Sequence, residues 1–477
     1  MNPVGEPVES LSVEATDIPG LLVVRLPLHG DDRGWFKENW QREKMVALGL
    51  PDFGPVQNNM SFNASRGATR GIHTEPWDKF VSLACGRVFA AWVDMREGDS
   101  FGVTVHLELD PSVAVFVPRG VGNSYQALED GTVYSYLVND HWRPGISYPA
   151  LHLADESAAI PWPIPLEEAE ISAKDQGNPR LQDVTPVPPR RPLIIGASGQ
   201  LGRALATEFP AAHLVDLVAD PARGVQQLDA SDPTALAAIE WRDYDTILNA
   251  AAYTAVDAAE TPEGRRAAWA ANAAAPAALA RVAGEHRLTL VHFSSEYVFD
   301  GTAELHTEDE PLSPLGVYAQ TKAAGDVAVY TAPWHYLIRT SWVVGEGRNF
   351  VRTMADLASK GVSPSVVDDQ VGRLTFTDEL ARATRHLLDT RAPWGTYNVT
   401  NSGDPMTWHD VAAEVFHLAG RDRRDITRTT TAEYAAGKDL APRPVNSVLD
   451  LTKIESTGFE PEPAVDALRR YLQDMGT

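Results

Sequence analysis

The sequence predicts two domains of different class: an all-β sandwich or barrel first, then an α/β domain built on a parallel sheet. At 477 residues the chain is too long for one ordinary domain. From about Leu11 to Pro149, short apolar or alternating runs are separated by Gly, Pro and Asp, which is typical of antiparallel strands. Beyond residue 192, apolar strands alternate with Ala-rich helical stretches, which indicates a parallel sheet covered by helices.

A proline-rich segment separates the two patterns. Residues 178–192 read NPRLQDVTPVPPRRP and show no periodicity. Because proline lacks an amide donor and fixes φ, this composition predicts an extended linker. We therefore expect a first domain over 1–180, a linker over 181–191 and a second domain over 192–477.

Charge and composition narrow the classes of partner. The formal net charge of −24 disfavours nucleic acid or an anionic membrane as the main partner. The single cysteine, Cys85, excludes an internal disulfide framework and a Cys-rich metal site. The N-terminus has no basic region followed by an apolar run, and no apolar stretch reaches the roughly 20 residues that span a bilayer. We expect a cytoplasmic protein with no nucleic-acid and no membrane partner.

A glycine-rich turn follows the first strand of the second domain. Gly196, Gly199 and Gly202 come directly after the apolar run 193–195, and a helix is expected to begin near Gln200. Glycine permits a tight turn and close approach of the backbone to a pyrophosphate, which the free amides of the helix N-terminus can bind. Such spacing alone also fits an ordinary turn, but its position after a strand favours a dinucleotide site.

An acidic residue ends the expected second strand of this domain. Asp216 is placed where a carboxylate can bind the adenosine ribose of NAD, although a solvated acid at the end of a strand is the alternative. Arg223 is close enough in sequence to leave NADP open. The choice between NADPH and NADH is therefore undecided.

A hydroxyl, a phenol and an ammonium group are candidates for carbonyl chemistry. Tyr318 and Lys322 share one helix face at their spacing of four, so the ammonium is expected to lower the phenol's pKa and make it a proton donor. Ser295 follows the strand LVHFS, at the sheet edge where ligands of such folds bind. Capping of the strand end is the alternative role for Ser295. Together the three groups predict polarisation of a carbonyl during hydride transfer.

The second half resembles dTDP-4-dehydrorhamnose reductase. The matching runs, in order from about 192 to 475, are GASGQLGRAL, LNAAAYTAVDAAE, SSEYVFDG, VYAQTK, RTSWVVG, DDQVGRLT and RPVNSVLDL. The resemblance implies a Rossmann fold of the short-chain dehydrogenase/reductase type, with Ser295, Tyr318 and Lys322 as catalytic residues, and leaves a requirement for Mg²⁺ open. It implies that the cofactor residues are Gly196, Ser198, Gly199, Gln200, Leu201, Gly202, Asp216, Ala250, Ala251, Ala252, Tyr318 and Lys322.

This half departs from the family at two places. Where the family has Ser-Thr-Asp-Tyr, the chain has Ser294-Ser295-Glu296-Tyr297, which keeps the hydroxyl and moves the carboxyl to a longer arm. Where the family has Tyr-Gly, the chain has Tyr318-Ala319. Neither change removes a reacting group.

The first half carries polar residues around His73. A lone histidine in a β domain is more often a packed or surface residue than a base, and the spacing of His73, His106 and His141 argues against a three-histidine metal site. Other polar residues nevertheless fall at the ends of the expected strands, and sequence alone does not show that they converge. They are Arg33, Glu38, Gln57, Asn59, Arg70, Lys79 and Tyr136.

These residues resemble dTDP-4-dehydrorhamnose 3,5-epimerase, a jelly-roll (cupin-like) enzyme that uses no metal. The matching runs over about 15–181 are DDRGWFKE, QNNMS, TRGIH, DKFVSLACGRVFAAWVDMREG, VFVPRGVGNSY, YSYLVNDHWRPG and ISAKD. The resemblance implies that His73 is the base, oriented by Asp175, that Lys79 stabilises the enolate, and that Tyr136 returns a proton. It implies a homodimer through this half. The residues implied to bind substrate are Arg33, Phe36, Glu38, Gln57, Asn59, Arg70, Asn123 and Trp142.

This half also departs from its family. A characteristic histidine of the family is Asn123 here, and the segment from His73 to Lys79 is shorter than usual. Loss of that histidine could weaken proton transfer or restrict the enzyme to one carbon centre.

The two resemblances concern consecutive steps, which predicts a bifunctional enzyme of dTDP-L-rhamnose synthesis. It would epimerise dTDP-4-dehydro-6-deoxy-D-glucose at C3 and C5 and then reduce the C4 ketone with NAD(P)H. Fusion raises the effective concentration of one site near the other. The alternatives are a single-centre epimerase/reductase that makes another dTDP-6-deoxysugar, and a non-catalytic NADP-binding regulatory protein.

Overall fold

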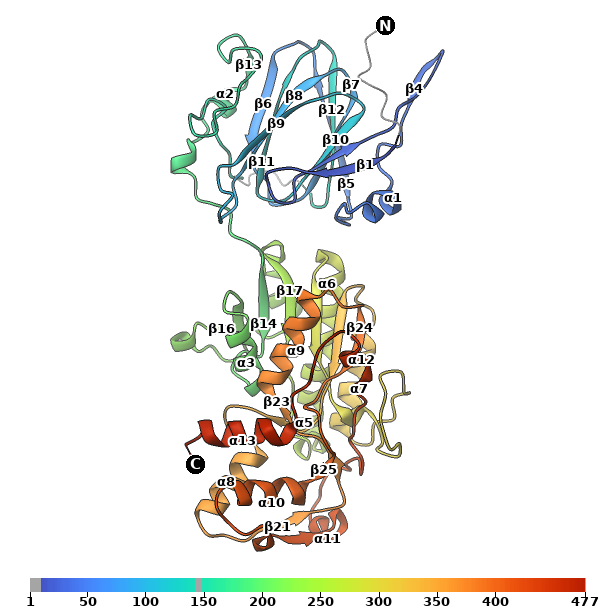
Figure 1. Ribbon diagram of the computed structural model, residues 1–477, viewed down its shortest axis with the longest axis vertical. Coiled ribbons are helices and arrows are strands. Elements are labelled where there is room, and N and C mark those ends of the chain that lie inside the picture. The colour runs from blue at the N-terminus through green and yellow to red at the C-terminus, as the bar shows by residue number, and fades with distance from the viewer. Residues whose placement is uncertain (1–9, 142–147, 477) are drawn as a thin grey trace. The chain divides into compact units, whose positions relative to one another are not determined.

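The computed structural model describes residues 10–141 and 148–476, and it divides into two compact units, Met1–Pro189 and Arg190–Thr477 (Figure 1). Over these described ranges, no helix is long and apolar enough to cross a membrane. The first unit is built almost entirely of strands and the second alternates strands with helices. This is the two-class architecture that the sequence pattern predicts.

Two sheets form the first unit. The six-stranded sheet has the order β1-β2-β10-β7-β12-β5 and the five-stranded sheet the order β13-β6-β11-β8-β9, with every pair antiparallel except β13 and β6. Apolar side chains from both sheets, including Leu83, Trp92 and Val115, meet in one buried cluster between them. The strands are β1 Ser12–Ala15, β2 Leu22–Arg25, β5 Gln57–Asn63, β6 Ala68–His73, β7 Lys79–Cys85, β8 Val88–Asp94, β9 Thr104–Leu109, β10 Val113–Val117, β11 Val121–Ala127, β12 Thr132–Val138 and β13 Glu170–Ile171.

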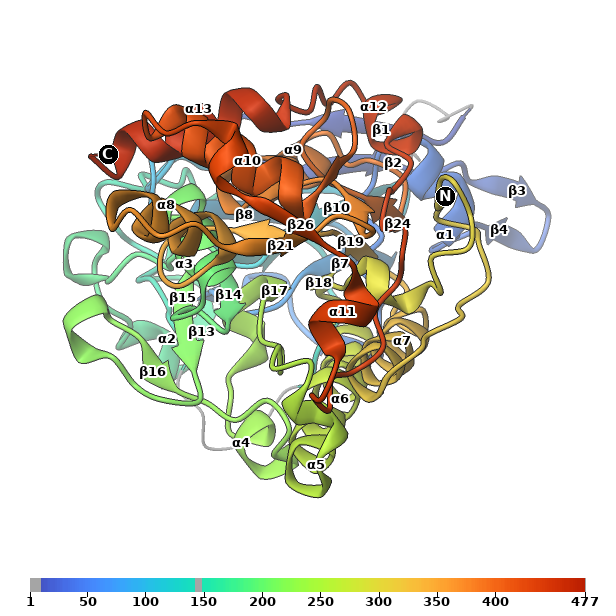
Figure 2. The same cartoon turned by 90° about the horizontal axis from the view of Figure 1, so that it is seen from below.

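A separate hairpin and a short helix precede β5. Strands β3 (His29–Asp31) and β4 (Gly34–Phe36) pair only with each other, and α1 spans Arg42–Ala47. In Figures 1 and 2 this hairpin projects from the side of the unit opposite β13 and α2 (Ala173–Gln176). All residues of β3 and β4 are exposed, so the hairpin's shape is held by its own turn rather than by burial.

The segment predicted as a linker is packed over most of its length. Leu181, Val184 and Val187 contact the apolar cluster of the first unit, and Leu181 lies in a short 3-10 helix, Leu181–Asp183. The Val187 amide donates to the Met95 carbonyl at 2.7 Å, and the Val187 carbonyl accepts from the Glu97 amide at 2.9 Å. The apolar residues between the prolines therefore bury their side chains, and β14 of the second unit begins soon afterwards at Arg191.

The second unit contains a seven-stranded parallel sheet of Rossmann type with the order β16-β15-β14-β17-β18-β19-β24. The chain leaves β14 toward β15 and then returns to β17 on its other side, which creates the switch point where such sheets bind ligands. The strands are β14 Arg191–Ile195, β15 His213–Asp216, β16 Gln226–Gln227, β17 Tyr244–Asn249, β18 Thr289–Phe293, β19 His335–Arg339 and β24 Gly395–Asn398.

Helices cover both faces of this sheet because successive strand residues point to opposite sides. Ile194 packs in a cluster with residues of α3 and α9, whereas its neighbours Leu193 and Ile195 pack with residues of α6. Figure 2 shows α9 and α6 on opposite sides of the sheet. The main helices are α3 Gln200–Glu208, α4 Pro233–Ala237, α5 Pro262–Trp269, α6 Ala275–His286, α7 Val317–Val329 and α9 Thr377–Asp389.

A smaller helical layer follows the sheet toward the C-terminus. Helices α8 (Phe350–Ser359), α10 (Trp408–Leu418) and α13 (Ala464–Asp474) share a third apolar cluster. Two short helices, α11 (Thr431–Ala435) and α12 (Thr452–Glu455), lie in the loops around them. The short strands are β20 Val343–Val344, β21 Ser365–Val367, β22 Val371–Gly372, β23 Thr375–Phe376, β25 Met406–Thr407 and β26 Thr427–Thr429.

Candidate active sites

The first unit brings the predicted base and its orienting carboxylate together. His73 ends β6 and Asp175 lies in α2, and the His73 Nε2 is 2.8 Å from an Asp175 carboxylate oxygen. Burial alone would raise the pKa of Asp175, but the hydrogen bond and charge of His73, with the Gly71 amide, hold this pKa below its ordinary value. An ionised Asp175 accepts the Nε2 proton, which leaves the other ring nitrogen of His73 able to accept a proton.

Lys79 begins β7 and lies beside a carboxylate that the sequence did not single out. Its side chain is buried, its ammonium pairs with Glu75, and it stands 5.8 Å from the centre of the Tyr136 ring. Burial first and the charge of Glu75 second raise the pKa of Tyr136, so this phenol stays protonated at neutral pH. Glu75 thus places a carboxylate next to the buried ammonium and the phenol. Only the spacing of four residues between Glu75 and Lys79 could have signalled the pair.

Asn123 is opposite His73 on the neighbouring strand β11. Its side-chain carbonyl accepts from the Trp92 indole at 2.9 Å and from the Tyr134 hydroxyl at 3.0 Å. Tyr134 in turn stacks on Tyr125 with ring centres 4.0 Å apart. The carboxamide therefore joins two strands through buried aromatic groups, and unlike a histidine it cannot take up or release a proton at this position.

The other predicted binding residues of this unit fall into two groups. The first group lies on the sheets: the Arg70 guanidinium donates to Asn63 at 3.1 Å, and the Gln57 amide donates to Asn59 at 2.7 Å. The second group is Arg33, Phe36 and Glu38 on and after the exposed hairpin, where Arg33 pairs with Asp31 and Glu38 with Lys44. The hairpin projects from the side of the unit opposite α2, the helix that carries Asp175 (Figure 1). Trp142 lies outside the described residues.

The glycine turn of the second unit is shaped by close backbone contacts. Gly196 has φ +83°, and a Cβ there would meet the Ala251 amide nitrogen at 2.6 Å. A Cβ on Gly202 would meet the Gly196 carbonyl oxygen at 2.0 Å, so only glycine lets α3 begin this close to the turn. The N-cap Gly199 has no side chain to occupy the first amides of α3, which leaves them able to bind phosphate oxygens.

Two predicted cofactor residues take structural partners beside this turn. One Asp216 carboxylate oxygen accepts from the Ser198 amide at 2.9 Å and the other from the Leu217 amide at 2.7 Å, so Asp216 closes the turn. The Gln200 side chain accepts from the Gly345 amide at 2.9 Å, which connects α3 to the segment after β19. Residues 250–252 follow β17, the strand next to β14. The residues present thus fit a dinucleotide.

Ser295, Tyr318 and Lys322 meet where β18 ends and α7 begins. The Ser295 hydroxyl donates to the Glu296 carboxylate at 2.7 Å, and a hydrogen bond links Ser295 with the Tyr318 phenol. The Lys322 ammonium is buried and donates to the Phe293 carbonyl at 2.6 Å. Burial lowers the pKa of Lys322 to about 8, against the opposing charge of Asp326.

The expectation that Lys322 lowers the pKa of Tyr318 is wrong for this structure. Burial and then the negative charge of Glu296 raise the pKa of the phenol, and the hydrogen bond with Ser295 opposes them only in part. The Lys322 ammonium is engaged with a backbone carbonyl instead. Tyr318 therefore holds its proton firmly until a developing negative charge on a ligand can accept it.

A partly exposed ion pair lies beside this site and was not assigned from the sequence. Arg443 pairs with both carboxylate oxygens of Asp257 at 2.9 Å and hydrogen-bonds Tyr297. Tyr297 stands edge-on to Tyr318 with ring centres 5.8 Å apart. Asp257 and Arg443 lie in the motifs AVDAAE and RPVNSVLDL, so motif position was the only available signal.

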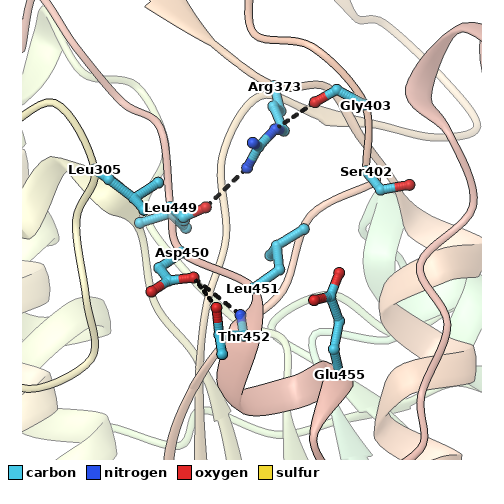
Figure 3. A pocket seen from close by; sticks show the side chains of 9 residues that line it. All are labelled: Leu305, Arg373, Ser402, Gly403, Leu449, Asp450, Leu451, Thr452 and Glu455. Atoms are coloured by element: carbon cyan, nitrogen blue, oxygen red, sulfur yellow. Dashed lines mark hydrogen bonds between the residues drawn. The ribbon is translucent and has the colours of Figure 1, made fainter.

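Two pockets border the second unit. One of 420 Å³ opens at the start of α7 between Trp269, Gly316 and Gln320, next to Tyr318 in the sequence. Another of 220 Å³ is lined by Arg373 and the start of α12 (Figure 3). In that pocket the Arg373 guanidinium is occupied by the carbonyls of Gly403 and Leu449. The first pocket therefore lies at the start of α7, the helix that carries Tyr318 and Lys322.

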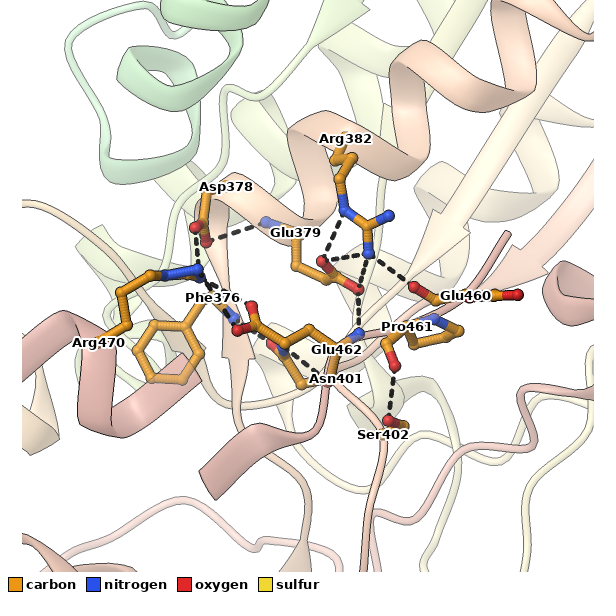
Figure 4. Close-up of polar contacts among 10 residues, drawn as sticks. All are labelled: Phe376, Asp378, Glu379, Arg382, Asn401, Ser402, Glu460, Pro461, Glu462 and Arg470. Atoms are coloured by element: carbon orange, nitrogen blue, oxygen red, sulfur yellow. Dashed lines mark hydrogen bonds and ion pairs between the residues drawn. The ribbon is translucent and has the colours of Figure 1, made fainter. Parts of the chain in front are cut away.

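Acidic residues do not assemble a metal site in the part of the chain that the structure describes. No group of three or more His, Cys, Asp or Glu side chains there could hold an ion. Where acids do gather, between α9 and α13, arginines neutralise them (Figure 4). Arg382 binds Glu379, and Arg470 binds both Asp378 and Glu462. These residues do not fit Mg²⁺, which prefers carboxylates free to bind it.

Comparison with known proteins matches each unit separately. The family model of the RmlD substrate binding domain matches residues 190–477, and that of dTDP-4-dehydrorhamnose 3,5-epimerase matches residues 15–183. Protein RmlC homolog of Streptococcus pyogenes is 46% identical over 184 residues, which are 37% of this chain and 92% of that protein. A probable dTDP-4,6-dihydroxy-2-methyloxan-3-one 4-ketoreductase of Streptomyces antibioticus is 41% identical over 291 residues, 59% of this chain and 95% of that protein.

Solved structures match the second unit. A dTDP-4-dehydrorhamnose reductase from Clostridium acetobutylicum is 33% identical and covers 60% of this chain and all of its own, with a TM-score of 0.55. One from Bacillus anthracis, in complex with NADP, is 29% identical and covers 60% of this chain and 99% of its own, with a TM-score of 0.52. The resemblance predicted for each half from its motifs is confirmed.

Proposed function

The chain belongs to the family with the RmlD substrate binding domain and, over its first part, to the dTDP-4-dehydrorhamnose 3,5-epimerases, and on that premise we propose that it is a bifunctional enzyme of dTDP-L-rhamnose synthesis. The first unit epimerises dTDP-4-dehydro-6-deoxy-D-glucose at C3 and C5, and the second reduces the C4 ketone with NAD(P)H. One observation carries this proposal: each unit assembles its own acid–base group, His73–Asp175 in one and Ser295–Tyr318–Lys322 in the other.

Epimerisation uses the acidity that a C4 ketone gives to the protons on C3 and C5. His73 removes a proton, and the ionised Asp175 stabilises the imidazolium that forms. Lys79 stabilises the enolate oxygen at C4, and Tyr136 returns a proton to the opposite face of the ring. We assign this two-sheet unit to the jelly-roll (cupin-like) class, with the residues named above from Arg33 to Trp142 binding the nucleotide sugar.

Reduction uses the second unit, which we assign to the short-chain dehydrogenase/reductase type. NAD(P)H, when bound, would supply the hydride. The glycine turn with the start of α3 would hold its phosphates, and Asp216, at the end of β15, would be the residue to bind its adenosine ribose. Tyr318 donates a proton to the carbonyl oxygen, Ser295 orients that oxygen, and Lys322 adds positive charge beside them. The relative solved with NADP supports a nicotinamide cofactor.

We further propose that the first units pair as a homodimer. The edge strand β5 turns Met60 and Phe62 outward, 66% and 64% exposed, which is more apolar surface than a free sheet edge usually leaves in water. Arg33 and Phe36 are exposed on a hairpin that projects away from α2 of their own chain. Both features are explained if β5 lies at the dimer contact and the hairpin completes the site of the second copy.

A second candidate function is favoured by Asn123 and by one relative. Asn123 cannot carry a proton as a histidine does, and the Streptomyces relative is named as a ketoreductase of a different dTDP-linked compound. In this alternative the epimerase inverts one centre, or the reductase gives another C4 configuration.

One experiment separates the candidates. The full chain is given dTDP-4-dehydro-6-deoxy-D-glucose with NADPH or NADH in deuterated water. Oxidation of the cofactor with deuterium at both C3 and C5 of an L-rhamnose product supports the main proposal. Deuterium at one centre, or a product with the other C4 configuration, supports the second candidate. If the sugar gains no deuterium and the cofactor is not oxidised, the remaining alternative is a protein that only binds NADP.

A further inference from the structure

Glu296 is a buried carboxyl in direct contact with the predicted catalytic hydroxyl of the reductase. It begins the 3-10 turn Glu296–Val298 directly after Ser295 and is only 4% exposed. Its carboxylate accepts the Ser295 hydroxyl proton at 2.7 Å, and its amide donates to the Thr340 carbonyl at 3.0 Å, which fixes the turn against β19. Glu296 also replaces the aspartate of the related motif, so its carboxyl stands on a longer arm.

The carboxyl is electrically coupled to both neighbouring phenols. Its negative charge raises the pKa of Tyr318 on α7 and of Tyr297 in its own turn. Burial raises the pKa of Glu296 itself to about 7. The other ionisable groups of this cluster are Arg443 behind Tyr297, and Lys322 and Asp326 further along α7, where Asp326 pairs with Arg339. Arg443 is neutralised by Asp257, and Lys322 donates to the Phe293 carbonyl rather than to Glu296.

We propose that Glu296 is a positioning residue of the reductase that holds a proton and supplies it through the Ser295 hydroxyl to restore Tyr318 after each reduction. The contacts form a continuous chain, since Ser295 is hydrogen-bonded to Glu296 on one side and to Tyr318 on the other. No other carboxyl among the described residues hydrogen-bonds the Ser295 hydroxyl. This inference rests on the reduction proposed above.

Each reduction consumes one proton in addition to the hydride. The carbonyl carbon gains a hydride with its two electrons, and the carbonyl oxygen gains the Tyr318 hydroxyl proton, which leaves a phenolate. The phenolate takes the proton of the Ser295 hydroxyl as Ser295 takes the proton of the protonated Glu296. One ketone, one NAD(P)H and one proton thus give one alcohol and NAD(P)⁺, and the Glu296 carboxylate recovers its proton from water between turnovers.

The test compares the pH dependence of reduction in full-length wild type and Glu296→Gln, with pre-epimerised 4-keto sugar and saturating NADPH. Below pH 7 the wild-type carboxyl is protonated, so Glu296→Gln should lower kcat by about tenfold or more, as loss of a proton donor does. Above pH 8 that carboxyl is already ionised, so the two rates should approach within about twofold. NADPH affinity and the thermal midpoint should be unchanged, because the amide still accepts from Ser295.

Two further variants complete the test. Glu308→Gln is the matched control: Glu308 is also a carboxyl whose pKa burial raises, but it accepts from the Asn398 amide, so its pH profile should follow wild type. Glu296→Asp keeps a carboxyl group on a shorter side chain. It should therefore shift the pH at which kcat for reduction is half of its maximum. The inference would be overturned if Glu296→Gln lost the same fraction of its rate at every pH, or lost none. It would also be overturned if the pH midpoint of Glu296→Asp equalled that of wild type. Each of these outcomes would leave the proposed reduction intact. Absence of NADPH and NADH oxidation by wild type at every pH would overturn the proposed reduction and the inference with it.

Discussion

His73 Nε2 lies 2.8 Å from the Asp175 carboxylate, although 102 positions separate the two residues in the chain. The contact joins the last residue of β6 to the short helix α2, and β13 pairs in parallel with β6 just before that helix. Pairing of β13 with β6 therefore places the carboxylate, and residues that are distant in sequence come to form one acid–base unit.

We predict that His73→Ala abolishes deuterium exchange at C3 and C5 while reduction of a pre-epimerised 4-keto sugar continues at the wild-type rate. His73 supplies the only side chain of this pair that can accept the carbon-bound proton. Asp175→Asn should lower exchange by about a hundredfold, because the amide no longer stabilises the imidazolium. Nuclear magnetic resonance of the sugar in deuterated water measures the exchange. Persistent exchange in His73→Ala would show that the base is another residue.

We predict that Asn123→Ala lowers the free energy of unfolding by about 1–3 kcal/mol. The Trp92 indole and the Tyr134 hydroxyl would each lose a buried acceptor that has no replacement by water. Urea denaturation of the full chain, followed by tryptophan fluorescence, measures the change. In the Tyr134→Phe background the same substitution should cost less, since one donor is already absent; an equal cost in both backgrounds would contradict this account.

The buried ammonium of Lys322 predicts a pH-dependent stability. Its pKa falls from the ordinary 10.5 to about 8 on folding, so between these values the unfolded chain binds a proton that the folded chain does not. The contribution of Lys322 to stability therefore becomes less unfavourable as pH rises from 8 toward 10.5. Lys322→Met removes this dependence and should abolish reduction. The thermal midpoint of Lys322→Met should exceed that of wild type by less at pH 9.5 than at pH 7.5. A constant difference would contradict the predicted rise in wild-type stability with pH.

We predict that Gly202→Ala weakens NADPH binding by more than about tenfold, because a Cβ 2.0 Å from the Gly196 carbonyl forces α3 away from the turn. Fluorescence of bound NADPH measures the affinity. Gly284→Ala is the matched control: Gly284 lies in α6, where a Cβ would be 3.7 Å from its nearest contact, Pro333. That control should bind NADPH normally, and equal loss in both variants would show that the turn is not the cause.

Local patterns could be predicted from the sequence, whereas long-range pairs could not. The glycine turn after β14 and the shared helix face of Tyr318 and Lys322 depend on spacings of a few residues, and both occur as predicted. Arg443 beside Asp257, 186 positions away, was missed because an ion pair leaves no periodicity in a sequence. Glu75 was missed for another reason: it is only four positions from Lys79, but that spacing alone does not indicate a pair.

The surroundings of a residue, which its spacing in the sequence does not show, also limited what could be predicted. The helix spacing placed Lys322 near Tyr318 correctly, but the direction of the phenol's pKa shift depends on burial and on Glu296, which arrives from another strand end. Likewise the prolines of 178–192 predicted an extended linker, while the apolar residues between them pack against β8 and the loop that follows it. The composition of a segment does not show whether another part of the chain offers a surface on which its apolar residues can pack.

The exposed hairpin with Arg33 allows a complementation test of the dimer. If it completes the site of a second copy, Arg33→Ala and His73→Ala should each lack epimerase activity alone but regain it when mixed. In a mixed dimer, one site combines the intact His73 of the first variant with the intact hairpin of the second, and the other site has neither. Random exchange of subunits makes half of the dimers mixed, so activity should return to about a quarter of wild type. If the hairpin serves its own chain, every site in the mixture lacks one residue and no activity returns. Deuterium exchange before and after unfolding and joint refolding of the two variants decides between these outcomes, and separately refolded variants are the control.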